Sequence, residues 1–331
     1  MRQKFVFQWH ITHRCNLRCQ HCYQEDYNKD LNKEELTDIF YKILEYINAH
    51  NYIGHINFTG GEPLLSNHFF DLLDLCKKYH ITFGILTNGT LIDEEIVKKL
   101  LQYDELRFVQ VSIDGIKETH DGIRGEGNFD KTLSAIRLLK QVHIQTMVSF
   151  TCTKNNFKEL KDVIKICRKN GVDRFWTDRL IPIGNNTLDI VSTDEYMQYL
   201  KILGRESRKA KRNPFIKMRI HTNRALQFVC GCEENCYRCS AGKSLLTILA
   251  DGTLLPCRRL PLPLGDLTVA HIDSIINNNE TIHMLNAENL APECEKCTYI
   301  NHCKGGAKCL TYAVTGKLIG QDINCPFSTS Y

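Results

Sequence analysis

Apolar positions along roughly the first 180 residues alternate between short strand-like runs and longer amphipathic stretches. The short runs are rich in β-branched and aromatic residues, whereas the stretches between them repeat their apolar positions with helical spacing. Strands are predicted at residues 4–12, 55–59, 82–88, 106–114, 146–153 and 173–181. Helices are predicted at residues 33–48, 67–79, 93–102, 129–141 and 156–170. This alternation favours a parallel α/β sheet built from right-handed crossover units.

Cysteine-, glycine- and hydroxyl-rich segments follow the ends of four predicted strands. Cys15–Cys22 follows the first strand, Thr59–Pro63 the second, Thr87–Thr90 the third and Ser112–Gly115 the fourth. Parallel α/β folds present functional groups at the carboxyl ends of their strands. The functional site is therefore expected at this end of the sheet.

The last third of the chain has a different composition. After a further predicted helix at residues 192–211, ten of the sixteen cysteines lie between Cys230 and Cys325. Only two short strand-like pieces occur there, at residues 244–252 and 254–257. The shift predicts two domains, residues 1–225 and 226–331, the second cross-linked by metal.

The overall composition narrows the class of protein. The chain has 331 residues, 43% of them hydrophobic, and a net charge of +4 that is spread along the sequence. No basic patch suggests nucleic acid, and no apolar run suggests a signal peptide or a membrane span. A cytoplasmic location is therefore expected. Cytoplasmic thiols stay reduced, so metal explains the cysteines better than disulfides do.

Three closely spaced cysteines follow the first predicted strand. Cys15, Cys19 and Cys22 form a C-x3-C-x2-C pattern. A four-iron cluster normally takes four thiolates, so three would leave one iron open to an exogenous molecule. A structural zinc site that takes a fourth ligand such as His13 or His21 is the alternative.

An aromatic residue, Tyr23, directly follows this loop, and a GGEP segment at residues 60–63 follows the second predicted strand. Together these motifs resemble the radical S-adenosylmethionine (SAM) enzymes over about residues 4–215. The resemblance implies a partial (β/α)6 TIM-like barrel with a [4Fe–4S] cluster on Cys15, Cys19 and Cys22. It also implies that the open iron chelates SAM, whose reductive cleavage yields a 5′-deoxyadenosyl radical that abstracts a substrate hydrogen.

The family pattern also suggests which residues contact SAM. It places Tyr23 beside the adenine, and Glu62 could pair with the SAM ammonium. Asn88 and Ser112 lie where the ribose or carboxylate is commonly bound, and Arg124 lies where relatives often contact an anionic group; turn chemistry or a solvated charge is the alternative for these three. The expected SAM-binding residues are Tyr23, Gly60, Gly61, Glu62, Pro63, Asn88, Ser112 and Arg124.

The C-terminal cysteines resemble the SPASM domain of radical SAM enzymes over about residues 230–331. A G-x4-C segment ends at Cys257 and is followed by C-x2-C-x5-C and a final cysteine. The resemblance implies one or two auxiliary [4Fe–4S] clusters, although zinc is the alternative for such cysteine pairs. The expected ligands are Cys236, Cys239, Cys257, Cys294, Cys297, Cys303, Cys309 and Cys325.

One departure from the SPASM pattern affects only one of the two clusters. Ala307 stands where a cysteine is usual, and the next thiol is Cys309. The cluster on Cys294, Cys297, Cys303 and Cys325 keeps all its family positions. The other would use Cys239 and Cys257, Cys309 as a displaced substitute, and one of three further thiols. Those three candidates are Cys230, Cys232 and Cys236.

An auxiliary cluster offers a path for one electron, which favours an oxidative outcome such as a crosslink or a dehydrogenation. The leading hypothesis is modification of a ribosomally made peptide, either docked directly or brought by a separate leader-binding protein. A dehydrogenase or epimerase of a carbohydrate or cofactor precursor is the alternative, and a non-catalytic iron–sulfur or zinc protein is the third. Sulfatase maturation is less expected, because Arg258 stands where those enzymes carry an acidic residue. Flavodoxin or ferredoxin is the expected electron donor.

Overall fold

The computed structural model describes residues 2–24, 30–184, 186, 188–231, 237–287 and 290–327. Its packing divides the chain into two compact units, each assembled from three segments. Unit 1 comprises Met1–Asn16, Gln24–Gln110 and Ser240–Glu288. Unit 2 comprises Leu17–Tyr23, Val111–Cys239 and Asn289–Tyr331. The three-cysteine loop therefore contributes residues to both units.

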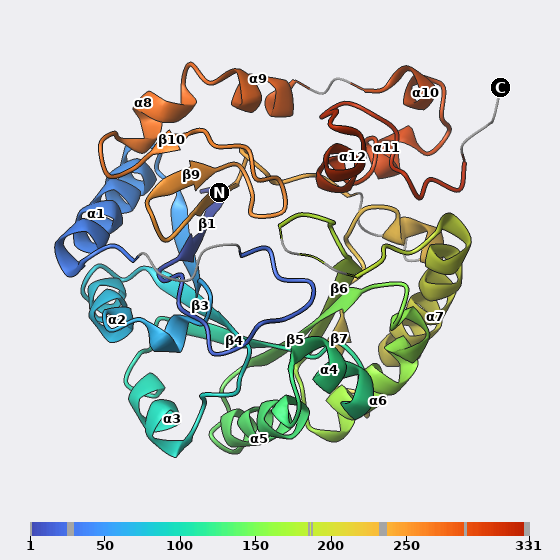
Figure 1. Ribbon diagram of the computed structural model, residues 1–331, viewed down its shortest axis with the longest axis horizontal. Coiled ribbons are helices and arrows are strands. Elements are labelled where there is room, and N and C mark those ends of the chain that lie inside the picture. Colours follow the sequence, from blue (N-terminus) through green and yellow to red (C-terminus); the bar gives the residue numbers. More distant parts are fainter. Residues whose placement is uncertain are drawn as a thin grey trace. The chain divides into compact units, whose positions relative to one another are not determined.

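The sheet of unit 1 has the strand order β10-β9-β8-β1-β2-β3-β4 (Figure 1). The pairs β8–β1, β1–β2 and β2–β3 are parallel, whereas β9 pairs antiparallel with both β8 and β10. Their bounds are β1 Lys4–His10, β2 Ile53–Thr59, β3 Thr82–Thr87, β4 Leu106–Ser112, β8 Leu245–Ile248, β9 Thr253–Leu255 and β10 Gly265–Asp266.

Alternating burial along β1 explains why this segment forms a strand. Phe5, Phe7 and Trp9 are buried on one face, where the ring of Phe5 packs edge-on against Tyr46 with centroids 5.2 Å apart. Tyr46 belongs to helix α1, which begins at a capping box formed by Asn32 and Glu35. The helices of unit 1 are α1 Lys33–Ala49, η1 Pro63–Leu65, α2 Phe69–Lys78, α3 Glu94–Leu100, α8 Ile272–Ile276 and α9 Glu280–Asn286.

In unit 2 the strands follow the order β5-β6-β7, and neighbouring strands pair in parallel. The strands are β5 Thr146–Cys152, β6 Arg174–Arg179 and β7 Arg219–Ile220. The helices before residue 240 are α4 Lys117–Arg124, α5 Asn128–Gln141, η2 Phe157–Glu159, α6 Leu160–Lys169, α7 Thr193–Arg212 and η3 Gln227–Cys230. Three short helices follow later in the chain: α10 Pro292–Glu295, α11 Ile300–Cys303 and α12 Lys308–Thr315.

The six predicted parallel strands and the helices between them are confirmed, with ends shifted by a few residues. The predicted helix at residues 192–211 is also confirmed as α7. Helix α4 was not predicted, because among its eight residues only His120 and Ile123 are buried. The domain boundary near residue 225 stays a prediction, and Leu245–Ile248 of β8 pairs with β1 in the sheet of unit 1.

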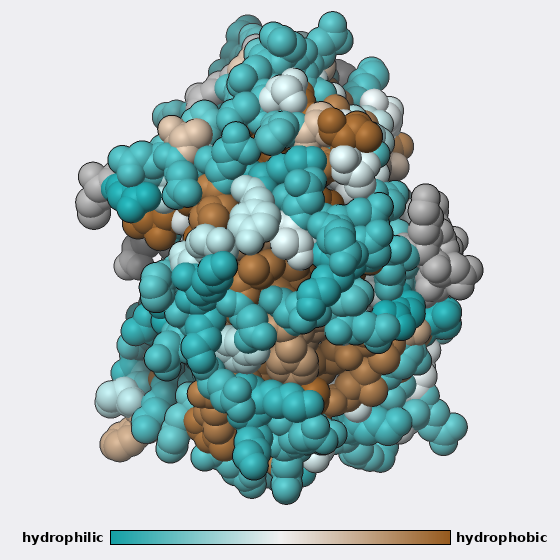
Figure 2. Space-filling model, turned by 90° about the vertical axis from the view of Figure 1, so that its left-hand side faces the viewer, coloured by the Kyte–Doolittle hydropathy of each residue, from teal (hydrophilic) through white to brown (hydrophobic). Residues whose placement is uncertain are grey.

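The face drawn in Figure 2 is mostly hydrophilic, with hydrophobic residues in several groups between hydrophilic ones. Scattered apolar side chains are normal on a protein surface. Within the described ranges, none of the helices combines the length and the apolar character needed to cross a bilayer.

Candidate active site

The beginning of the cysteine loop lies against the GGEP segment in unit 1. The backbone N–H of Gly61 donates to the carbonyl of Thr12 at 2.8 Å, and that of Glu62 donates to the carbonyl of Arg14 at 2.8 Å. A Cβ atom on Gly61 would lie 2.3 Å from the Arg14 oxygen, and one on Gly60 would lie 2.5 Å from the Thr12 oxygen. Both glycines are therefore needed for this close backbone approach.

The Asp30 carboxylate binds the stretch of chain just before Cys15. Asp30 accepts hydrogen bonds from the Thr12 hydroxyl at 2.6 Å, the His13 N–H at 2.6 Å and the Arg14 Nε at 3.0 Å. Charge-assisted hydrogen bonds of this kind fix geometry more firmly than neutral ones. These bonds fix the position of the chain just before Cys15.

Glu62 connects the GGEP segment to the loop after β3. Its carboxylate is fully buried and accepts the Thr87 hydroxyl at 2.7 Å and the Asn88 backbone N–H at 2.9 Å. It also caps η1, which begins at Pro63, by accepting the Leu64 N–H at 3.4 Å. These contacts position Glu62 through groups of its own unit, and its contact with the SAM ammonium stays a prediction.

The side chain of Asn88 reaches back towards the cysteine loop. Its Nδ2 atom donates to Asn16 Oδ1 at 2.9 Å, and its Oδ1 atom accepts from Thr90. Asn16 in turn donates to the Thr90 hydroxyl at 2.8 Å. Because Asn16 directly follows Cys15, this ring of hydrogen bonds links the loop after β3 to the first cysteine.

In unit 2, a buried ion pair lies beside the second cysteine. Arg124 Nη2 lies 2.6 Å from Asp114 Oδ2, His21 Nε2 lies 3.2 Å from the same oxygen, and Arg124 Nη1 lies 3.8 Å from Cys19 Sγ. Although burial alone would raise the pKa of Asp114, Arg124 and His21 hold this pKa well below its usual range. Burial raises the pKa of the Cys19 thiol, and the charge of Arg124 opposes that shift.

The other expected SAM contacts of unit 2 have local partners. The Ser112 hydroxyl lies 3.4 Å from the Ser149 hydroxyl. Tyr23 packs against a buried apolar cluster that contains Ile181 and Leu310. The backbone N–H of Cys22 donates to the Cys19 carbonyl at 3.1 Å, so these two cysteines lie on one tight turn.

Four C-terminal cysteines of unit 2 act on one another electrostatically. Burial, followed by the charges of Cys325 and Cys297, raises the pKa of Cys294 to about 11. Burial, Asp322 and the other three thiols raise the pKa of Cys303 to about 12. Such mutual effects act over short distances, so these four thiols lie near one another, and their role as ligands of one cluster stays a prediction.

A buried arginine anchors the loop that leads to Cys325. Arg179, at the end of β6, donates to both carboxylate oxygens of Asp322 at 2.6 and 2.8 Å and to Asn324 Oδ1 at 2.9 Å. Asp322 also accepts the backbone N–H of Ala307 at 2.7 Å. Sequence reasoning missed Arg179 and Asp322, because they are 143 positions apart and neither belongs to a motif.

Family models match both parts of the chain. Residues 9–154 match the radical SAM superfamily, and residues 239–298 match the SPASM iron–sulfur cluster-binding domain. The chain has a radical SAM domain followed by a SPASM domain. These domains imply SAM and [4Fe–4S] clusters as cofactors.

Curated relatives of this radical SAM protein include enzymes with different substrates in their names. The chain is 27% identical to the AdoMet-dependent heme synthase of Methanosarcina barkeri, over 96% of this chain and 95% of that protein. It is 27% identical to the sporulation killing factor maturation protein SkfB of Bacillus subtilis, over 87% of this chain and 67% of that protein.

A solved structure supports the fold of the radical SAM and SPASM domains. Native anSMEcpe with bound AdoMet and the Cp18Cys peptide has a TM-score of 0.80, with 22% identity over 97% of this chain and 93% of that chain. The α/β fold of this chain is therefore that of a partial (β/α)6 barrel with a SPASM domain.

The residues present fit the implied clusters in their chemistry. The described cysteines include Cys15, Cys19 and Cys22 as well as Cys294, Cys297, Cys303 and Cys325. Within the described ranges, no three Cys, His, Asp or Glu side chains converge closely enough for a single metal ion. A [4Fe–4S] cluster has a different requirement, because its thiolates surround a group of irons. Cys294, Cys297, Cys303 and Cys325 have the thiol chemistry for such a cluster, and their ligand roles stay predictions.

The second expected set of SPASM ligands is described only in part. Cys236 and Cys232 lie outside the described residues. Cys257 belongs to unit 1, whereas Cys239 belongs to unit 2. Cys309 packs against the apolar cluster around Leu310, which also contains the buried Ala307. The ligand roles of Cys236, Cys239, Cys257 and Cys309 stay predictions.

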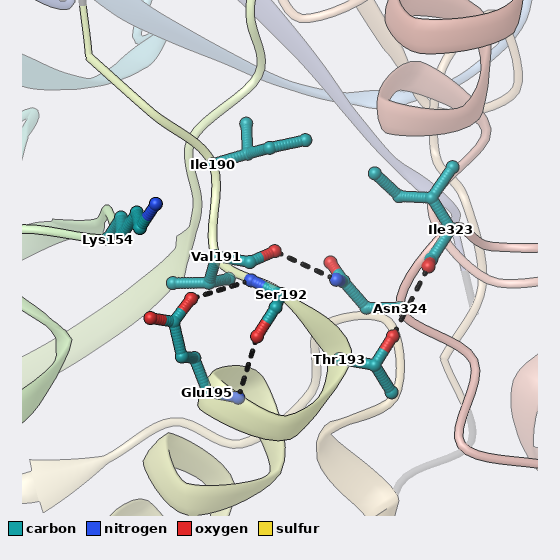
Figure 3. A pocket seen from close by; sticks show the side chains of 8 residues that line it. All are labelled: Lys154, Ile190, Val191, Ser192, Thr193, Glu195, Ile323 and Asn324. Carbon is teal, nitrogen blue, oxygen red and sulfur yellow. Dashed lines mark hydrogen bonds between the residues drawn. The ribbon is translucent and has the colours of Figure 1, made fainter.

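A cavity of about 560 Å³ opens beside the start of α7 in unit 2 (Figure 3). Several lining residues bond to one another: Ser192 and Glu195 form a capping box, and Asn324 Nδ2 donates to the Val191 carbonyl at 3.0 Å. The bond between Asn324 and Val191 fixes the residue before Cys325, so the cavity lies beside the loop that carries this cysteine. The lining residues are Lys154, Ile190, Val191, Ser192, Thr193, Glu195, Ile323 and Asn324.

Proposed function

We propose that this radical SAM protein oxidises a ribosomally made peptide, forming a crosslink or a dehydrogenated residue. The observation that carries the proposal is the gathering of Cys294, Cys297, Cys303 and Cys325 in unit 2. A cluster on these thiols supplies an acceptor for the electron that a substrate radical must lose in a net oxidation. The relative SkfB, a maturation protein by name, supports a peptide substrate.

The residues of the radical SAM domain prepare the site for SAM. When bound at the open iron and reduced by one electron, SAM supplies the 5′-deoxyadenosyl radical that abstracts the substrate hydrogen. Asp30 and Gly61 fix the chain before Cys15. Arg124 bonds to Asp114 and also contacts the Cys19 sulfur, so the ion pair fixes the surroundings of this thiol. Flavodoxin or ferredoxin is the proposed donor of the reducing electron.

Oxidation of a tetrapyrrole is the second candidate. One observation favours it: the heme synthase of Methanosarcina barkeri aligns with this chain along 95% of its own length, whereas SkfB aligns along 67% of its length. Both candidates require an electron acceptor after hydrogen abstraction, so the four-cysteine set is compatible with either. The choice between them depends on the substrate group that the protein recognises.

Anaerobic reconstitution with iron and sulfide, followed by SAM and dithionite, tests the proposed function. We expect 5′-deoxyadenosine, with about eight irons per chain for one auxiliary cluster or about twelve for two. Cys303→Ala should lower the iron content by about four, whereas Cys167→Ala, which removes a buried thiol of α6, should not. Failure to form 5′-deoxyadenosine from a fully loaded wild-type protein would contradict radical chemistry.

Mass spectrometry of the treated substrate tests the oxidative part. Candidate precursor peptides should lose a pair of hydrogen atoms in the presence of SAM and dithionite, and the Cys303→Ala variant should not produce this change. An unchanged peptide mass together with an oxidised tetrapyrrole would replace the first candidate with the second.

A further inference from the structure

One face of the sheet in unit 1 is lined by polar side chains. Along β1 and β2, the residues that point to this face alternate with fully buried aromatic or aliphatic residues. The strand register places Gln8 beside Asn57 and Thr247, and His10 beside Thr59. These neighbours form one continuous surface across three strands, which we call the polar face: Gln8, His10, Asn57, Thr59 and Thr247.

The opposite face of the same strands is a hydrophobic core. Phe7, Trp9, Ile56, Phe58 and Ile248 are each 0% exposed. The polar face, in contrast, keeps Gln8, His10, Asn57 and Thr59 partly exposed. Polar side chains stay on a sheet face when water or a ligand occupies the space in front of them. The polar face is therefore suited to contact a ligand.

An arginine from the SPASM domain lies at this face. The backbone N–H of Arg258 donates to the Thr247 hydroxyl at 3.1 Å, which places the residue next to β8. Its charge reaches His10: burial and then the charge of Arg258 hold the pKa of His10 well below its usual range. The imidazole is therefore neutral near pH 7, and Arg258 supplies the positive charge.

We propose that Arg258 binds a carboxylate of the substrate at the polar face. This inference rests on the proposed function, because it names the substrate group that the radical enzyme recognises. The planar guanidinium matches a carboxylate with two parallel hydrogen bonds. Gln8 and Asn57 offer further donors at the same surface. An acidic peptide side chain and a tetrapyrrole propionate both present this group.

Binding to the reconstituted protein with SAM, in the absence of reductant, tests the carboxylate separately from catalysis. The first probe is a fluorescein-labelled peptide rich in glutamate, compared with the same peptide carrying glutamine. The second probe is an iron porphyrin with four propionates, compared with its tetramethyl ester. We expect wild-type protein to bind one acidic probe at least about tenfold more tightly than its neutral counterpart, equivalent to 1.4 kcal/mol.

The variants identify the residue responsible. Arg258→Gln should bring the ratio between acidic and neutral probes close to one, and Arg258→Lys should retain part of it, because a lysine keeps the charge but not the fork. Arg259→Ala changes the next residue of the same turn and should preserve the wild-type ratio. Iron content is measured for each variant, and ratios are compared only between samples of equal loading.

The outcomes separate the two proposals. A peptide preference identifies an acidic side chain as the source of the carboxylate, and a porphyrin preference identifies a propionate. Wild-type protein that binds neither acidic probe better than its neutral counterpart overturns the inference, as does an unchanged ratio in Arg258→Gln. Because these measurements use no reductant, they stand whether or not wild-type protein forms 5′-deoxyadenosine, which tests the proposed function alone.

Discussion

Arg124 Nη2 lies 2.6 Å from Asp114 Oδ2, and both side chains are almost completely buried. Asp114 also accepts the backbone N–H of Thr151 at 2.8 Å, so the pair is fixed to β5. Removing one partner of a buried ion pair leaves the other charge without compensation. The pair therefore makes the environment of Cys19 sensitive to a single substitution.

The Asp114→Asn variant should be markedly less stable than the wild type. We expect a loss of about 3–5 kcal/mol in the free energy of unfolding, the range for a broken buried pair. Anaerobic urea denaturation of the reconstituted protein measures the effect. The control is Asp130→Asn, which breaks the exposed pair with Lys117 and should leave the denaturation midpoint nearly unchanged. Equal midpoints for Asp114→Asn and wild type would contradict the prediction.

Gly61→Ala should impair assembly of the radical SAM cluster. The added Cβ atom would meet the Arg14 carbonyl at 2.3 Å, so the segment before Cys15 has to move. Iron analysis after reconstitution should show about four fewer irons per chain than wild type. Gly122→Ala is the matched control, because a Cβ atom there meets nothing within 4 Å. An iron content equal to wild type in Gly61→Ala would show that the loop tolerates the displacement.

Stability should fall as the pH is lowered below about 6.5. Burial, followed by the charge of Lys4, lowers the pKa of His55 to about 4, whereas the unfolded chain has the ordinary value. The unfolded state therefore binds more protons between these values, and stability rises with pH across this window. His55→Gln should reduce the slope of the urea midpoint against pH between about 4.5 and 6.5. An identical slope in the variant would exclude His55 as its source.

Much of the fold could be predicted because its strands and helices have strong local signals. The alternation of Phe5, Phe7 and Trp9 with polar residues identifies β1 without tertiary information. The motifs after the strands could be predicted for a similar reason, since residue type and spacing are local. Glu62 is an instructive intermediate: its motif is visible in sequence, but its bonds to Thr87 and Asn88 require the folded sheet.

The rest depends on contacts between distant segments. The pairing of β8 with β1 brings residues near position 247 beside residues near position 8, and no local pattern encodes that register. The bond between Arg179 and Asp322 spans 143 positions. Short helices such as α10 and α11 have four residues each and depend on tertiary packing more than on helix propensity.

The Asp322→Asn variant should lose one auxiliary cluster, because the loop that leads to Cys325 is no longer held in position. Both Asp322 and Arg179 are 1% exposed, so the variant leaves a buried guanidinium without its carboxylate partner. Asp322 also accepts the backbone N–H of Asn324 at 3.0 Å, next to Cys325, so the loop loses its anchor together with the ion pair. We expect about four fewer irons per chain after reconstitution.

A second buried pair distinguishes this local effect from general destabilisation. Arg168 of α6 and Glu206 of α7 form an ion pair in the same unit, and neither residue belongs to the loop that carries Cys325. Glu206→Gln should lower the urea midpoint while keeping the iron content of the wild type. If Asp322→Asn and Glu206→Gln lose iron equally, the loss follows from stability. If only Asp322→Asn loses iron, Asp322 positions the ligands of the auxiliary cluster through the loop between Ala307 and Cys325.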